Sequence, residues 1–372
     1  MGRHARSDTF APKRVGDKGG ANNNMSKREP HLGRFHSSFV ILFGFLLAFC
    51  LPGVTPYARA EMFTFQTINA PGAVFGTDLF GIDNSRQIVG MYTTAVAQMG
   101  LSYSSGTFTT IDYPGSSSSQ VNGISDSGDY LVGLYGNTSG GHGFLDFAGR
   151  FSTIQFPRST FTSAQGVNDS GEIVGLYSIL RGPEEGFTDS YGRYTEIAFP
   201  GARQTIANGI NNSGEVVGWY STSTGFMQGF LDNHGTFSTV DFPGAATTVV
   251  TGINDFGELV GWYVAAGTRV DQGFIYSAGT FTTLDFPGAV ATNVFGINDP
   301  GLVVGSYDLA TGFDNGFLAI PPHPRVIIPE PSSFQLCTIA AFALLLWYRR
   351  KLPGVSQSGS ATTASEPPRN RR

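Results

Sequence analysis

Hydrophobic and polar residues alternate along the middle of the chain in short runs that end at turn-forming residues. Residues 237–242 are mostly β-branched or aromatic, and a Pro-Gly turn pair follows them. Residues 247–253, 258–263 and 272–276 predict three further strands, and residues 254–257 (Asn-Asp-Phe-Gly) predict a turn between the first two. This part of the sequence lacks helical periodicity. The pattern therefore predicts four short strands in roughly 43 residues.

The same pattern recurs six times between residues 61 and 320. Its copies are variants of Gly-Ile-Asn-Asp-x-Gly-x-Val-Val-Gly-x-Tyr, at spacings of 42 to 44 residues, and begin at Gly81, Gly123, Gly166, Gly209, Gly252 and Gly296. A period of roughly 40–50 residues marks an array of structural repeats, and four strands are the content of a β-propeller blade. The sequence predicts an all-β domain over residues 61–320, with six repeats forming a six-bladed β-propeller. An open stack of repeats is the alternative, although it would expose edge strands.

The repeat resembles the HAF-type probable extracellular repeat. In that family a Gly-Ile-Asn-x-x-Gly-x-x-Val-Gly segment is followed by a His-Ala-Phe-Leu-like step. The corresponding step here reads Gly-Phe-Leu at residues 229–231 and Gly-Phe-Ile at residues 273–275. The resemblance covers residues 63–320 and implies a repeat architecture outside the cell, with no agreed activity.

The N-terminal part has the features of a signal peptide. Residues 39–49 are apolar and follow basic residues, and Ala58-Arg59-Ala60 forms an A-x-A cleavage site. We therefore predict that residues 1–60 are a signal peptide, that signal peptidase cleaves after Ala60, and that the protein is exported. Met25 is an alternative start of translation.

The C-terminal part contains a tail in three sections. A Pro-Glu-Pro motif (Pro329, Glu330, Pro331) precedes an apolar stretch at residues 334–348. A basic cluster follows the stretch and consists of Arg349, Arg350 and Lys351. This order resembles the PEP-CTERM sorting signal, which implies recognition by an exosortase-type membrane protease. The apolar stretch is shorter than the ~20 residues that a single span usually needs, and a plain membrane anchor is the alternative. The predicted segments are a linker (321–333), the hydrophobic segment with its basic cluster (334–351) and a disordered extension (352–372). Tails of the PEP-CTERM family usually end soon after the basic cluster and lack such an extension.

Charge and cysteine content restrict the chemistry of residues 61–320. They contain 16 Asp and 7 Glu against 7 Arg and no Lys, a net charge of −16. Such a surface should repel nucleic acids and anionic lipids, so we expect no nucleic-acid partner.

Cys50 and Cys337 both lie outside this region. The repeat region therefore lacks a disulfide, a thiolate nucleophile and Cys-ligated zinc.

The repeat region contains no recognisable catalytic or metal-binding motif. His142 and His234 occur in neither an H-x-H nor an H-E-x-x-H arrangement. Asp112, Asp241 and Asp285 recur at one repeat position, which indicates a structural role. The Asn-Asp turns, such as residues 168–172, offer oxygen ligands but lack the alternating carboxylates of a calcium loop. We therefore predict structural turns and no catalytic residue, metal or cofactor, with calcium as the alternative.

Aromatic residues are the best candidates for binding. Trp219, Tyr220, Trp262 and Tyr263 lie at repeated positions, and such rings stack on sugars with an apolar face and a polar tip. Packing between blades is the alternative. The two tryptophans are favoured because the other repeats place Met, Leu or Ser there.

Two classes of function remain. The first is an exported and sorted protein of the cell envelope or extracellular matrix, with a non-enzymatic structural or binding role linked to extracellular polysaccharide. The second is a polysaccharide-active enzyme, a glycosidase or a lyase, on a propeller scaffold. Acidic residues that occur in only one repeat, at one end of the central channel, would favour the enzyme. Equivalent residues in every repeat around the channel would favour the non-enzymatic envelope or matrix protein.

Overall fold

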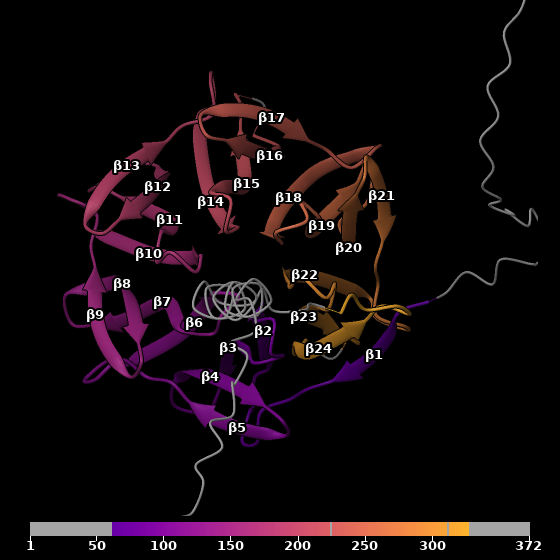
Figure 1. Cartoon of the computed structure of the whole chain (residues 1–372), viewed down its shortest axis with the longest axis horizontal. Coiled ribbons are helices and arrows are strands. Elements are labelled where there is room, and N and C mark those ends of the chain that lie inside the picture. The colour runs from indigo at the N-terminus through magenta and orange to yellow at the C-terminus, as the bar shows by residue number, and fades with distance from the viewer. Residues whose placement is uncertain (1–61, 224, 311, 327–372) are drawn as a thin grey trace, which may run out of the picture. The chain divides into compact units, whose positions relative to one another are not determined.

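The computed structural model describes residues 62–326 except 224 and 311, and these residues form an all-β propeller without a helix (Figure 1). Within these residues, no helix has the length and apolar character that a membrane span requires. Several predicted features lie outside the described residues: the signal peptide with Ala58 and Ala60, residues 329–331, the segment 334–351 with its basic cluster, and the extension 352–372.

Hydrogen bonding joins the strands into four sheets of four strands and one sheet of eight strands. Three of the four-stranded sheets consist of strands that follow one another along the chain. They are β2 (Thr77–Ile82), β3 (Ile88–Thr93), β4 (Gln98–Ser104) and β5 (Thr107–Thr110); β6 (Ser118–Ile124), β7 (Tyr130–Asn137), β8 (Gly140–Phe147) and β9 (Arg150–Ile154); and β18 (Ala245–Ile253), β19 (Leu259–Ala265), β20 (Asp271–Ser277) and β21 (Thr280–Thr283).

The eight-stranded sheet has two antiparallel halves. One contains β10 (Phe161–Val167), β11 (Ile173–Ser178), β12 (Glu184–Ser190) and β13 (Arg193–Ile197). The other contains β14 (Gln204–Ile210), β15 (Glu215–Ser221), β16 (Met227–Asn233) and β17 (Thr236–Val240). Their single connection is a parallel pairing of Glu185 with Thr205.

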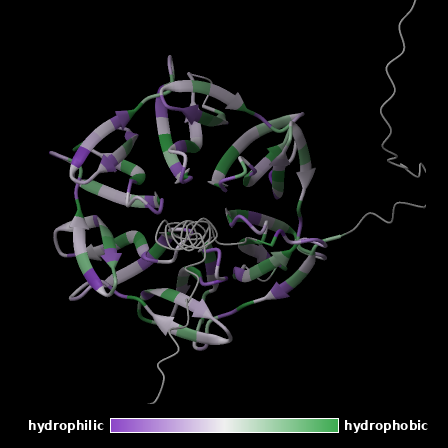
Figure 2. Ribbon diagram, in the orientation of Figure 1, coloured by the Kyte–Doolittle hydropathy of each residue, from purple (hydrophilic) through white to green (hydrophobic). Residues whose placement is uncertain are grey.

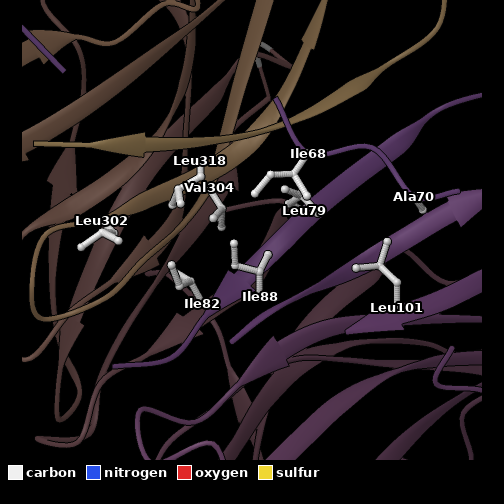
Figure 3. Close-up of a cluster of buried hydrophobic side chains, with 9 residues drawn as sticks. All are labelled: Ile68, Ala70, Leu79, Ile82, Ile88, Leu101, Leu302, Val304 and Leu318. Atoms are coloured by element: carbon white, nitrogen blue, oxygen red, sulfur yellow. The ribbon is translucent and has the colours of Figure 1, made fainter. Parts of the chain in front are cut away.

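The start and the end of the described chain meet in one sheet. Strands β22 (Ala291–Ile297), β23 (Val303–Asp308) and β24 (Asn315–Ile320) are completed by β1 (Thr64–Thr67), which pairs antiparallel with β24. The hydroxyls of Thr67 and Tyr307 lie 2.8 Å apart in a hydrogen bond. Figure 3 shows Leu302, Val304 and Leu318 packed with residues of β2 to β4 in one buried cluster. The first and last repeats are therefore in contact, as a closed ring requires.

A repeated aromatic stack fills the interior of the blades. The Phe of each Gly-Phe step is fully buried at five positions, namely Phe144, Phe187, Phe230, Phe274 and Phe317. Beside them a tyrosine stacks on the aromatic residue that precedes the Pro-Gly turn; the Tyr220 and Phe199 ring centroids are 3.7 Å apart. Hydrophobic residues accordingly recur in all the sheets around the ring rather than on one side of it (Figure 2).

The turn between the first and second strands of a blade follows the predicted chemistry. Oδ1 of Asn168 accepts hydrogen bonds from the backbone N–H groups of Ser170 and Glu172, at 3.1 and 3.0 Å. Gly214 and Gly257 have φ values of 80° and 71°, which confirms the predicted use of glycine in these turns.

The beginning of the predicted linker lies against these turns. The Arg325 guanidinium donates to Glu258, with Nη2 2.7 Å from Oε1, and its Cζ lies 4.7 Å from the centre of the Phe256 ring. The Arg325 guanidinium holds the pKa of the Glu258 carboxyl at about 2. The side chains of residues 256 and 258 thus hold the segment at residue 325 on this face of the propeller.

Candidate functional site

A β-bulge occurs at the same position in the strand of each repeat that lies nearest the centre of the ring (Figure 1). One residue at each bulge is left out of the pairing register, and a bulge re-aims the side chain that it contains. We call these six the bulge residues: Phe80, Asn122, Gln165, Asn208, Thr251 and Phe295. All of them line the central channel.

The glycine after each bulge residue allows neighbouring inner strands to approach closely. A Cβ on Gly252 would lie 2.9 Å from the Phe295 carbonyl oxygen, and a Cβ on Gly296 would lie 2.7 Å from that of Phe80. Such distances leave no space for a side chain, so these positions require glycine. The invariant part of the repeat therefore builds a narrow ring that carries the bulge residues.

The bulge residues and four further side chains enclose a cavity of about 270 Å³, which we call the channel cavity. The four are Gln120, Trp219, Val249 and Trp262. Aromatic rings lie along an arc from β15 through β19 and β22 to β2, where the Phe80 and Phe295 rings pack edge to face at 5.2 Å. Amide side chains lie along the arc formed by β6, β10 and β14. The cavity thus has an aromatic side and an amide side.

Hydrogen bonds hold the amide side in place. Nδ2 of Asn122 donates to the Ala164 carbonyl at 2.8 Å, and its Oδ1 accepts from Gln120 Nε2 at 2.7 Å. Asn208 Nδ2 donates to the Val250 carbonyl at 2.8 Å. An amide has two N–H donors and one acceptor oxygen. Among the hydrogen bonds of the described residues Asn208 makes only this one, so its oxygen and one N–H remain for a ligand.

The other end of the channel is closed by a ring of side chains from the turns, which we call the acid–amide ring. Its members are Asn84, Asp126, Asp169, Asn212, Asp255 and Asp299. Asn212 Nδ2 lies 3.0 Å from Asp126 Oδ2 and 2.9 Å from Asp255 Oδ2. Because these three residues belong to turns of different blades, their hydrogen bonds run across the channel and close it.

The crowded carboxylates change the pKa of Asp126. Burial raises its pKa to about 8, and the negative charges of Asp299, Asp255 and Asp169 add to the effect. Oxygens of Asp126, Asp255 and Asp299 lie within 4.8 Å of one another, and among the described residues this is the group whose spacing suits a metal ion. Asn amides and backbone N–H groups already donate to these carboxylates, which accounts for the arrangement without an ion.

The four aromatic candidates from the sequence divide between two environments. Trp219 and Trp262 line the channel cavity. Tyr220 and Tyr263 are buried inside the blades, where their hydroxyls hydrogen-bond to Thr239 and Thr283 at 2.9 and 3.1 Å. The two tyrosines are therefore packing residues, and of the four only the tryptophans can reach a ligand in the channel.

Other residues that the sequence brought forward lie away from the channel cavity. Asp285 Oδ1 accepts the Gly273 N–H at 3.0 Å, and Asp112 Oδ1 accepts the Gly100 N–H at 3.3 Å. His142 lies between Ser139 and Gln155, with Nδ1 2.6 Å from the Gln155 Oε1. These groups hold strand ends together.

Sequence reasoning missed the bulge residues. The available signal was the position before each repeat-initial glycine, which varies among Phe, Asn, Gln and Thr, although a small or aliphatic residue always precedes it and glycine always follows it. Variation at one position inside a constant motif indicates a side chain that is not needed for packing.

No protein-family model matches the chain, and no curated protein matches it. Solved propeller structures are similar to it at low identity. The SapL1 lectin in complex with α-methyl fucoside has a TM-score of 0.47 at 9% identity, over 70% of this chain and 99% of that chain. TolB from Acinetobacter baumannii has a TM-score of 0.46 at 12% identity, and the match spans 67% of this chain and 64% of TolB. The propeller domain of the trilobed protease from Pyrococcus furiosus has a TM-score of 0.42 at 9% identity, over 67% of this chain and 94% of that chain. Similarity this low assigns neither a ligand nor a reaction.

Proposed function

We propose that this chain is an exported binding protein of the cell envelope or extracellular matrix, and that it binds extracellular polysaccharide in the channel of a six-bladed propeller. Each half of the eight-stranded sheet is then a blade of its own, because one parallel pair connects them. The repeat spacing supports the same count.

The observation that carries the proposal is the difference between the scaffold and the channel lining. The blade interiors repeat the same Phe and Tyr residues, whereas the six bulge residues differ from one repeat to the next. A cavity with rigid aromatic rings and a few fixed polar groups is typical of small-ligand sites. Aromatic faces beside amide groups match the apolar faces and hydroxyl edges of sugar rings.

The carboxylates near the channel support a non-enzymatic role. An enzyme that cleaves glycosidic bonds usually requires a pair of acids with distinct environments beside the bound sugar. The lining of the channel cavity contains no acidic residue. The acids at the other end belong to near-equivalent turns. Their carboxylates accept hydrogen bonds from the Asn212 side chain and from backbone N–H groups of neighbouring turns.

The location in this proposal rests on the two ends of the chain. The A-x-A site supports export, and the Pro-Glu-Pro tail with its basic cluster supports handling by an exosortase-type protease. Signal peptidase and that protease are therefore the proposed processing partners, and the C-terminal segment is the proposed membrane attachment before cleavage.

Co-sedimentation with the extracellular polysaccharide of the native host tests the proposal. We expect the full chain to sediment with the polysaccharide, and the pair of substitutions Trp219→Ala and Trp262→Ala to reduce binding at least tenfold. Phe75→Ala is the matched control, because this exposed ring packs on Phe313 away from the channel and its loss should leave binding unchanged. Equal binding by the unchanged chain and the double variant would contradict the proposal.

A further inference from the structure

We propose that the channel cavity binds the terminal, uncharged sugar residue of a glycan end-on. This inference rests on the function proposed above and specifies which part of the polysaccharide is recognised. Three features of the channel support it: a closed end, a cavity of limited size, and a lining without charge.

The channel is blind. Past the bulge residues the channel is narrower, and the cavity between the inner strands there has a volume of about 70 Å³. This volume has room for a few water molecules. Beyond it the acid–amide ring closes the axis, where Asn212 Nδ2 lies within 3.2 Å of carboxylate oxygens of Asp126, Asp169 and Asp255, which belong to the turns of three other blades. A polysaccharide therefore cannot thread through the ring, and only a chain end can enter the cavity.

The cavity is small. Its volume of about 270 Å³ lies below the usual range of roughly 300–1,000 Å³ for pockets that hold drug-sized molecules. One sugar ring fits such a space with its faces beside Trp219 and Trp262 and its hydroxyls toward the amides. The following residues of the glycan then extend from the open mouth and make few contacts.

The lining favours an uncharged sugar. The ten residues around the cavity include no Arg, Lys or His, so a buried carboxylate would have no cationic partner. Asp169, Asp255 and Asp299 of the acid–amide ring add negative potential from the closed end. A uronic acid, sulfated or phosphorylated sugar is therefore disfavoured relative to its neutral counterpart.

Counting binding sites on the host polysaccharide tests the end-on mode. Random partial hydrolysis doubles the number of chain ends at constant mass, and the saturating amount of bound protein per milligram should rise about twofold. A capacity that follows mass instead of chain ends would overturn the inference while leaving the proposed function intact. If the untreated polysaccharide does not bind the full chain at all, the proposed function itself fails.

Competition experiments test the preference for uncharged sugars. We expect methyl glycosides of neutral hexoses to displace the polysaccharide, and glucuronic and galacturonic acid to be at least tenfold weaker. Asn208→Asp replaces the N–H that remains for a ligand by a carboxylate oxygen, and it should weaken binding about tenfold. The matched control Asn137→Asp lies on an exposed hairpin end and should bind like the unchanged chain. Displacement by uronic acids at equal or lower concentration would overturn this part of the inference.

Discussion

Glycine serves two different purposes in each repeat. Gly257 has a φ of 71° with open space around it, whereas Gly261 has ordinary backbone angles but a Cβ there would lie 2.0 Å from the Val249 carbonyl oxygen. The first position needs glycine for its conformation, and the second needs it for space. The two kinds of position therefore predict different costs of substitution.

We expect Gly257→Ala to lower the free energy of unfolding by about 1 kcal/mol, because alanine is strained at positive φ. Gly261→Ala should cost about 3 kcal/mol, because the backbone of β18 must move. Thermal melts of the two variants measure both effects. If calcium held these turns, a chelator would lower the melting temperature of the unchanged chain more than Gly257→Ala does, and the structural interpretation of the turns would be wrong.

Asp126 makes stability depend on pH in a particular direction. Its pKa rises from 3.8 to about 8 on folding, because burial and neighbouring carboxylates disfavour the charged form. The folded state then binds more protons than the unfolded state between these values, so this group's contribution falls as pH rises from about 4 through 8. Asp126→Asn should remove this slope and stabilise the protein at pH 8 by at least about 1 kcal/mol.

Chemical denaturation between pH 4 and 9 measures the effect of Asp126→Asn. Asp129→Asn, at an exposed position of the same turn, is the control and should keep the slope of the unchanged chain. A destabilised Asp126→Asn protein at pH 8 would show that the carboxylate is needed in its charged form, for instance by a bound cation.

At the level of strands, the sequence predicts the elements well and their irregularities poorly. Predicted strands at residues 247–253, 258–263 and 272–276 correspond to β18 (Ala245–Ile253), β19 (Leu259–Ala265) and β20 (Asp271–Ser277). Hydrophobic alternation and turn residues are local signals, and they located these strands. A bulge depends on the register with a partner strand, which no local pattern contains. The bulge at Thr251 and its equivalents was therefore not predictable from strand patterns, and the sequence signalled these positions only through their variation before the repeat-initial glycine. Trp262 was predicted as a candidate because most other repeats have no tryptophan at that position.

Strand β1 supplies the contact that completes the ring. The Phe65 ring lies 5.3 Å from Phe286 and 5.7 Å from Phe317, in the sheet otherwise made of C-terminal strands. Phe65 is half-buried, so Phe65→Ala removes this packing and should lower the free energy of unfolding by about 2 kcal/mol. Urea denaturation compares it with Phe75→Ala, which should cost less than about 1 kcal/mol at its exposed position. Equal losses would mean that β1 contributes little to closure.

At the level of the whole molecule, the proposed processing removes both ends of the chain and leaves the propeller. The A-x-A site and the three-section tail predict a mature protein that begins at Glu61 and ends near residues 329–331. Intact-mass analysis of protein released by the native host measures both ends. A mass that still includes residues 334–351 would indicate a permanent anchor instead of a cleaved sorting signal.

The bulges separate the residues that build the ring from the residues that line its channel. A residue at a bulge stays out of the pairing register and does not fill a blade, but Asn122, Asn208 and Thr251 each donate a hydrogen bond to a carbonyl of the next inner strand. An exchange among Phe, Asn, Gln and Thr therefore costs such hydrogen bonds and leaves the glycines and buried rings in place. Under the proposed function, substitutions at these six positions change the ligand preference of the channel while the blade interiors keep their residues. For protein engineering, the same six positions form a compact library on a scaffold whose architecture need not be redesigned.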